Sequence, residues 1–237
     1  MIEIIDVEQG SPEWFKARVG LPTASRFSEI LAEGGDDRGL PQSVMDAMVK
    51  SGCTAAQLAA AVKGAKSRSA GGTRRKYLRD LAAEIIRGAP EEEAYSNAYM
   101  ERGKVQEDDA RRMYAFMYDA EPQRVGFIKN GRKGCSPDSL IGELGGLEIK
   151  TALGHIQIER LMKGTLPSEH VAQVQGSLWV TEREWWDFCS YSPNLPMLVV
   201  RVQRDEDYIA KMADAVDGFL GELDELVEKV RRYGGAT

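Results

Sequence analysis

The chain has few of the residues that build sulfur or imidazole metal centres. Its 237 residues include three cysteines, Cys53, Cys135 and Cys189, and two histidines, His155 and His170. Three scattered cysteines cannot close a four-cysteine cluster or a four-ligand zinc site, and their odd number predicts reduced thiols. Two histidines are too few for a histidine-based centre. We therefore expect each histidine to be hydrogen-bonded in the fold or exposed to water.

Long apolar runs are also missing. No stretch approaches the roughly 20 apolar residues that span a bilayer, and residues 1–6 lack the basic start and apolar core of a secretory signal. We therefore expect no membrane association and a cytoplasmic location. The hydrophobic share of 43% and the charged share of 29% are ordinary for a soluble globular protein. The length suits one large domain better than two small ones, so we expect a single domain over residues 1–237.

An excess of positive charge, the usual mark of a nucleic-acid-binding protein, is absent: the net charge is −6. The charges are nevertheless unevenly distributed. Residues 204–229 hold nine acidic and three basic residues, whereas residues 63–80 hold seven basic residues and one acidic residue. The net charge therefore says little about any single face and does not exclude a DNA-binding surface.

The most informative stretch is residues 136–150, SPDSLIGELGGLEIK. It predicts two short strands, 138–141 and 147–151, joined by a glycine-rich turn. Alternate side chains of a strand share a face, so Glu148 and Lys150 project together while Ile149 points into the core. Antiparallel pairing of the strands would bring Asp138 onto the face of Glu148 and Lys150.

Two carboxylates and an ammonium group would then converge on one point of this face. Carboxylates and backbone carbonyls are the ligands that Mg²⁺ prefers, and a nearby lysine can position or deprotonate a water molecule. The alternative is that Asp138 is a turn residue after Pro137 and that Glu148 and Lys150 form a solvated strand face. The combined spacing within one hairpin favours the site.

Hydroxyl groups precede the second predicted helix, which runs from Thr23 to about residue 31. Together with free backbone N–H groups, the hydroxyls of Thr23 and Ser25 can bind a phosphate, and Arg18 could add a bidentate contact. Plain N-capping by Thr23 or Ser25 is the alternative, and the local pattern favours capping.

Two further side chains have two readings each. Glu107 lies on a predicted helix over 94–117, at the edge of an apolar stripe whose buried face we expect to be Ala110, Met113, Tyr114 and Met117. It is either a surface acid or a carboxylate aimed at a metal. Gln173, on a helix beginning near residue 166, is either exposed or turned toward a polar site.

The remaining pattern predicts an α/β fold. Further helices are expected at 11–20, 43–51, 55–63, 73–87, 156–162 and 205–232, and strands at 124–129, 185–191 and 197–203. This order indicates a central mixed sheet of four or five strands flanked by helices. Residues 34–72 read as a variable insert, either a DNA-contacting loop or a surface excursion.

Taken in order, the motifs resemble the lambda-exonuclease family, also called the YqaJ-like phage recombinase nucleases, within the restriction-endonuclease-like PD-(D/E)xK group. The resemblance covers nearly the whole chain outside the insert. It rests on WFKARVG at 14–20, TAS at 23–25, RGK at 102–104, EDDAR at 107–111, CSPD at 135–138, LEIK at 147–150, AQVQ at 172–175, WVT at 179–181 and RDE at 204–206.

The resemblance implies a restriction-endonuclease-like core and a Mg²⁺-dependent exonuclease, an exodeoxyribonuclease that digests one strand of linear double-stranded DNA from its 5′ end to mononucleotides. By motif position, Asp138, Glu148 and the carbonyl of Ile149 would be metal ligands, with Glu107 as a further acid. Lys150 would orient and activate the attacking water. Two Mg²⁺ ions are implied, for which Mn²⁺ can substitute.

The resemblance also changes the reading of the hydroxyl groups. The positions that bind the 5′-terminal phosphate in relatives are matched here by Arg18, Ser25, Ser136 and Gln173, with Thr23 beside them. The resemblance therefore favours a phosphate-binding pocket over helix capping. A ring-shaped homotrimer enclosing DNA and a single-strand annealing protein as partner are implied as well. The sequence departs from the family at Ser139, where relatives commonly have glycine.

Two other functions remain open at this point. One is a nuclease of the same core with the other polarity, or an endonuclease. The other is a catalytically inactive protein that binds DNA ends. The complete set of Glu107, Asp138, Glu148 and Lys150 argues against the inactive protein, because a binding module has no chemical need for all four.

Overall fold

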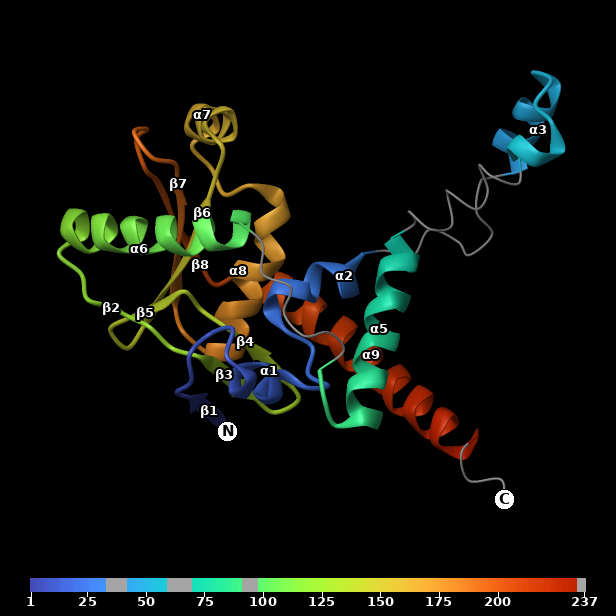
Figure 1. The fold of residues 1–237 in the computed structure, drawn as a ribbon, viewed down its shortest axis with the longest axis horizontal. Helices are drawn as coiled ribbons and strands as arrows, with labels where there is room; N and C mark the ends of the chain where they lie inside the picture. The colour runs from blue at the N-terminus through green and yellow to red at the C-terminus, as the bar shows by residue number, and fades with distance from the viewer. Residues whose placement is uncertain (33–41, 59–69, 91–97, 234–237) are drawn as a thin grey trace.

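The computed structural model describes residues 1–32, 42–58, 70–90 and 98–233 (Figure 1). The described chain forms a five-stranded sheet with the order β2-β5-β6-β7-β8 and a three-stranded sheet with the order β1-β3-β4. The elements are β1 (Ile2–Ile5), α1 (Pro12–Arg18), the 3₁₀ turn η1 (Ala24–Arg26), α2 (Phe27–Leu31), α3 (Gln42–Lys50), α5 (Ala70–Arg87), α6 (Ala98–Tyr118), β2 (Pro122–Gln123), β3 (Phe127–Asn130), β4 (Lys133–Cys135), β5 (Ser139–Ile141), β6 (Gly145–Thr151), α7 (Gly154–Lys163), α8 (Ser168–Thr181), β7 (Trp185–Tyr191), β8 (Leu198–Gln203) and α9 (Glu206–Tyr233).

The predicted hairpin is the centre of the larger sheet. Strands β5 and β6 pair antiparallel, with Ser139 opposite Leu147, and β6 pairs parallel with β7. The turn contains Gly142 in the left-handed region, with a φ of 52°. Gly145 and Gly146 belong to β6 and not to the turn as predicted. They are required there because a Cβ would lie 2.1 and 2.3 Å from the rings of Trp185 and Trp186.

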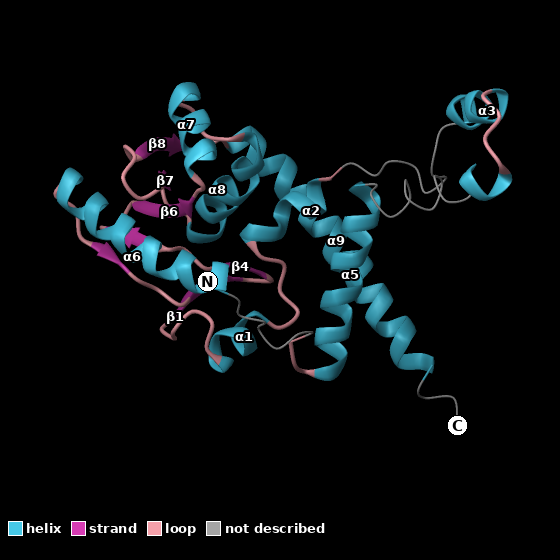
Figure 2. Cartoon of the chain, turned by 45° about the horizontal axis from the view of Figure 1, so that its top comes forward, coloured by secondary structure: helices cyan, strands magenta, loops and turns pink. Residues whose placement is uncertain are grey.

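Helices cover both faces of this sheet, as α6 lies along one face and α8 packs on the other (Figure 2). The alternation of strand side chains separates the two faces. Leu147 and Ile149 are buried in a cluster with Ala110 and Tyr114 of α6. Glu148 therefore faces the α8 side, in register with Phe188 of β7. The mixed α/β architecture and the buried position of Ile149 are confirmed.

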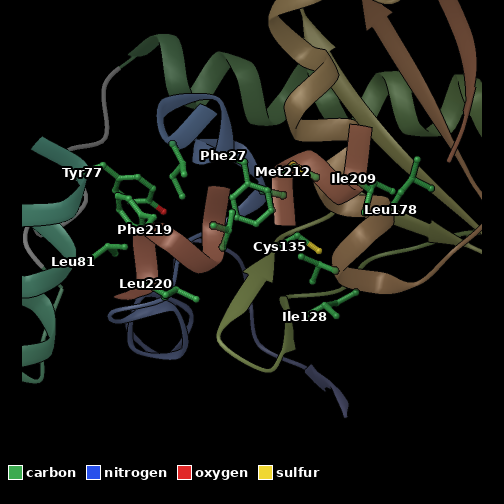
Figure 3. Packing of buried hydrophobic residues seen from close by; sticks show 14 of the residues in the cluster. Phe27, Tyr77, Leu81, Ile128, Cys135, Leu178, Ile209, Met212, Phe219 and Leu220 are labelled. Carbon is green, nitrogen blue, oxygen red and sulfur yellow. The ribbon is translucent and has the colours of Figure 1, made fainter. Parts of the chain in front are cut away.

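The larger hydrophobic core lies between α2, α5, α8 and α9 (Figure 3). Phe219 of α9 is fully buried against Tyr77 of α5, with ring centroids 5.5 Å apart. Truncating such an aromatic side chain to alanine typically costs about 3–5 kcal/mol. Helix α9 packs its apolar side chains into this core, although Val230 near its end is exposed.

Several predicted boundaries were wrong. The second helix does not begin at Thr23, because η1 precedes a short α2. The strand predicted at 124–129 is β3, shifted to Phe127–Asn130, and the sequence pattern missed β1, its antiparallel partner. Residues 34–41 and 59–69 of the predicted insert lie outside the described residues, as does most of the predicted helix 55–63.

The predicted buried face of α6 was half wrong. Ala110 and Tyr114 are buried, but Met113 and Met117 are 40% and 54% exposed. The reason is that Arg111 is buried beside Ala110, which rotates the helix so that the two methionines face outward.

Candidate active site

Asp138 lies immediately before β5 and is fixed across the hairpin. Its Oδ2 accepts a hydrogen bond from the backbone N–H of Ile149, at 2.5 Å. Because Ser139 is opposite Leu147, the next residues outward are Asp138 and Glu148. Burial raises the pKa of Asp138 well above its ordinary value, and the charges of Glu148 and Glu107 raise it further. The site therefore concentrates negative charge that the protein alone does not fully neutralise.

Glu148 is held by groups from its own strand and from α8. Its Oε1 lies 2.5 Å from Nζ of Lys150 and accepts a hydrogen bond of 2.5 Å from Nε2 of Gln173. Burial lowers the pKa of Lys150, but the carboxylates of Glu148 and Asp138 outweigh it, so the net shift is upward. This shift favours the ammonium form of Lys150, which can donate a hydrogen bond.

Glu107 approaches from α6. Its Oε1 lies 2.5 Å from Nη2 of Arg111, one helical turn later. With Asp138, Glu107 lines a cavity of about 490 Å³ whose other walls are residues 6–9, 105, 108, 111 and 124–126. Glu107 is therefore not a plain surface acid, and one cavity contains both it and Asp138.

The three carboxylates share a pattern that bears on metal binding. One oxygen of each is held by a protein donor, and the second oxygen accepts no hydrogen bond from the described residues. Within those residues, no three histidine, cysteine, aspartate or glutamate side chains are close enough to hold a metal ion as they stand. The donors available are hard oxygens, and the charges of Glu148 and Glu107 add to burial in raising the pKa of Asp138, an effect that a bound cation would oppose. This set fits a divalent cation such as Mg²⁺ or Mn²⁺.

Arg18 stands close to this site through Trp14. Its guanidinium stacks on the Trp14 ring at 4.0 Å, and Nε1 of Trp14 donates to Oγ of Ser136 at 2.9 Å. Burial lowers the pKa of Arg18, although Tyr77 and Glu84 oppose the shift. Among the described residues, no hydrogen-bond acceptor or carboxylate within ion-pair distance satisfies this guanidinium. A half-buried cation without an anion is an unfavourable arrangement unless a ligand supplies the anion.

The hydroxyls of Thr23 and Ser25 lie 3.3 Å apart, and the Thr23 side chain caps no helix N–H. The backbone N–H of Thr23 instead donates to the Tyr77 hydroxyl at 3.0 Å. The capping alternative is therefore wrong for Thr23. Ser25 is exposed, whereas Thr23 is buried, with its hydroxyl close to that of Ser25.

The predicted residues thus form two groups. Hydrogen bonds and ion pairs join Asp138, Ile149, Glu148, Lys150 and Gln173, and Glu107 reaches this group through the shared cavity. Trp14 joins Arg18 to Ser136, which lies two residues before Asp138. No described contact links Thr23 or Ser25 directly to either group.

Three residues with positional roles were missed by sequence reasoning. Gln9 donates to the carbonyls of Val125 and Pro137 at 2.9 and 2.8 Å, which fixes the approach to Asp138. No sequence signal identifies Gln9. Trp14 and Arg111 lie within the motifs at 14–20 and 107–111, and an arginine four residues after Glu107 on a helix could have been expected to pair with it.

The histidines behave as expected. His155 is exposed, and His170 stacks on Phe188, with ring centroids 5.0 Å apart, and lies 3.2 Å from Nη2 of Arg160. Burial lowers the pKa of His170 to about 4, and the charges of Lys150 and Arg160 act in the same direction. The ring is therefore neutral near pH 7 and accepts a hydrogen bond from Arg160.

Comparison with known proteins identifies the family. The model of the YqaJ-like viral recombinase domain matches residues 46–184, more than half of the chain. The chain therefore belongs to this family. A 68-residue stretch is 32% identical to the ExoD protein of Escherichia coli (strain K12), covering 27% of this chain and 78% of that protein.

Solved structures agree with the family. Two crystal structures of the alkaline exonuclease LHK-Exo from Laribacter hongkongensis, one in complex with dAMP, are 28% identical over 95% of this chain and 98% of theirs, with TM-scores of 0.74 and 0.72. A phage-related exonuclease from Haemophilus somnus 129PT shares the fold, with 16% identity over 89% of this chain and 96% of its own length and a TM-score of 0.54. Family and fold together place the chain among the exodeoxyribonucleases.

Proposed function

We propose that this protein is a divalent-metal-dependent exonuclease that digests one strand of linear double-stranded DNA from a 5′-phosphorylated end to mononucleotides, in support of single-strand-annealing recombination. The observation that carries the 5′ polarity is Arg18, a half-buried guanidinium with no carboxylate within ion-pair distance among the described residues. A 5′-terminal phosphate supplies an anion, and guanidinium groups bind phosphate bidentately. The LHK-Exo complex with dAMP supports a mononucleotide as product.

In this proposal the two groups of residues have different roles, one in binding the DNA end and the other in hydrolysis. Arg18, Ser136 and the hydroxyls of Thr23 and Ser25 bind the terminal phosphate, which sets how far the strand enters. Ser136 lies two residues from Asp138 in sequence, so the distance from the end pocket to the acids is short and fixed. Such a distance selects the first phosphodiester, and a mononucleotide is released.

The acids form the second group. Asp138, Glu148 and the carbonyl of Ile149 would hold a divalent cation, with Glu107 as the further acid; Mg²⁺ is the ion proposed, as a pair, with Mn²⁺ able to substitute. When bound, the cations supply neutralisation of phosphate charge and activation of water. Lys150, kept as an ammonium by Glu148 and Asp138, donates a hydrogen bond that orients the water for in-line attack. Gln173 restrains Glu148 and can turn one N–H to the DNA phosphate.

A homotrimer is proposed as the assembly. Helices α6 and α7 leave large apolar side chains in water, with Phe116 and Met162 exposed by 90% and 83%. Large apolar side chains exposed on a helix face are candidates for a protein interface. Other copies of the chain are the proposed partners at this surface, with a single-strand annealing protein as a further partner.

We also propose one domain over 1–237 with an insert at 34–72, and the cytoplasm as its location. Within the described residues no helix is long and apolar enough to cross a bilayer.

The test uses linear duplex DNA with 5′-phosphate ends, supplied with and without Mg²⁺. Wild-type protein is expected to release mononucleotides only with the metal, and Asp138→Ala is expected to release none. A covalently closed circular duplex is the control for an endonuclease, and it should stay intact. Cutting of the circle would favour the endonuclease, and absence of both digestion and Mg²⁺ binding would favour the inactive end-binding protein.

A further inference from the structure

Arg111 is the most extensively bonded side chain near the acids, and the proposed chemistry gives it no role. It lies on α6 with its side chain only 10% exposed. Its Nε donates to Oγ of Ser139 at 2.9 Å, and Nη1 donates to Oδ1 of Asp108 at 2.7 Å. Its Nη2 donates both to Oε1 of Glu107, at 2.5 Å, and to the backbone carbonyl of Asp138, at 3.2 Å. One guanidinium thus joins the helix that carries Glu107 to the strand that follows Asp138.

Ser139 completes this connection. Its side chain is fully buried, accepts from Arg111, and donates to the carbonyl of Asp138 at 2.6 Å. The Asp138 carbonyl therefore receives two donors, one from Ser139 and one from Arg111. Because the Asp138 carboxylate is held separately by the N–H of Ile149, both ends of this residue are fixed.

Glu107 gains most from the arrangement. It reaches the cavity from a helix on a long side chain that is 32% exposed, and Arg111 is its only described partner. Without Arg111 the carboxylate could adopt several rotamers, and its separation from Asp138 would not be defined. Arg111 uses only Oε1 of Glu107, which leaves Oε2 free to face a cation.

We infer that Ser139 and Arg111 form a positioning pair that sets Glu107 relative to Asp138 before a divalent cation binds. The inference rests on the proposed function of the same acids. Arg111 touches no reacting atom in this scheme and acts through Glu107. The Ser139 hydroxyl has both a donor and an acceptor in place, so this buried polar group is satisfied.

The test measures Mg²⁺ binding by calorimetry with the metal alone, beside the Mg²⁺ dependence of DNA digestion, kcat and KM for DNA, and the Tm. Arg111→Gln is expected to weaken Mg²⁺ binding by roughly 10- to 100-fold, the usual effect of losing a group that orients a metal ligand. Ser139→Ala is expected to weaken it by roughly 2- to 10-fold, the effect of one neutral hydrogen bond. In both variants KM for DNA should stay unchanged, and excess Mg²⁺ should restore much of the rate of Ser139→Ala.

Two variants sharpen the result. Arg112→Gln, which removes an exposed pair with Asp109 on the same helix, is the matched control and should bind Mg²⁺ like wild type. Arg111→Lys keeps the positive charge but loses the planar guanidinium that donates to several acceptors at once, and should not recover wild-type Mg²⁺ binding. Wild-type Mg²⁺ affinity in Ser139→Ala, or full recovery by lysine, would overturn the inference. If Arg111→Gln does not fold, the Mg²⁺ affinity of Ser139→Ala tests the inference. Failure of the proposed function would look different, because wild type itself would then release no nucleotides.

Discussion

Replacing Arg18 by glutamine should abolish the preference for 5′-phosphorylated ends. In the structure this guanidinium is half-buried, stacks on Trp14, and has no carboxylate partner among the described residues. Its charge is therefore available to the ligand. A hydrogen bond to a charged group contributes about 1.5–3 kcal/mol, which corresponds to roughly 10- to 150-fold in kcat/KM.

The assay compares kcat/KM on matched duplexes that end in a 5′-phosphate or a 5′-hydroxyl. Wild type should prefer the phosphate by roughly 10- to 150-fold, and Arg18→Gln should show a ratio near one while its rate on the hydroxyl end is little changed. The Tm should also change little, because the lost stacking, worth roughly 0.5–2 kcal/mol, is offset by removing an unpaired cation from a half-buried position. Arg132→Gln, which breaks an exposed pair with Asp224, is the control. An undiminished phosphate preference in Arg18→Gln would refute the end-pocket reasoning.

Three further predictions follow from the same structure. Asp138→Asn should lower the rate of DNA digestion by at least about 10²-fold. The same change should raise the Tm of the metal-free protein near pH 8, because the raised pKa of Asp138 means that the fold disfavours its charged form. A lower Tm would contradict this. His170 has a pKa of about 4 in the folded protein against about 6.5 in the unfolded chain, so the stability that its neutral form contributes, at most about 3 kcal/mol, is lost as the pH falls from 6.5 toward 4. Denaturant unfolding at pH 7.5 and pH 5 should show that His170→Gln loses less stability than wild type on acidification. An equal loss in both proteins would show that His170 is not the group responsible. Phe116→Asp should leave the fold intact and shift the protein from the proposed trimer to smaller species in light scattering, whereas an unchanged mass would remove this residue from the proposed interface.

The sequence predicted the hairpin well because its signals are local. Alternation placed Glu148 and Lys150 on one face with Ile149 buried, and the glycine-rich connection implied an antiparallel partner, which sufficed to bring Asp138 opposite Glu148. Such periodicity depends on neighbours within a few residues, so it survives tertiary packing.

The features of the site that the sequence did not predict depend on contacts between segments that are far apart in the chain. Gln9 bonds to carbonyls at Val125 and Pro137, more than 110 residues away, as its separations of 116 and 128 show. The rotation of α6 was mispredicted because the buried residue beside Ala110 is a charged one. Arg111 is buried only because four acceptors surround it, from α6, from Asp138 and from β5, which no count of apolar residues along the helix reveals.

The most direct test of the central claim follows both ends of one strand. A linear duplex with a phosphate label at one 5′ end is digested beside the same duplex labelled at the 3′ terminus, with Mg²⁺ and with either wild type or Glu148→Gln. Wild type should release the 5′ label as a mononucleotide in the first turnovers and the 3′ label last, and Glu148→Gln should release neither label. Early release of the 3′ label, labelled oligonucleotides as first products, or wild-type digestion by Glu148→Gln would contradict that claim.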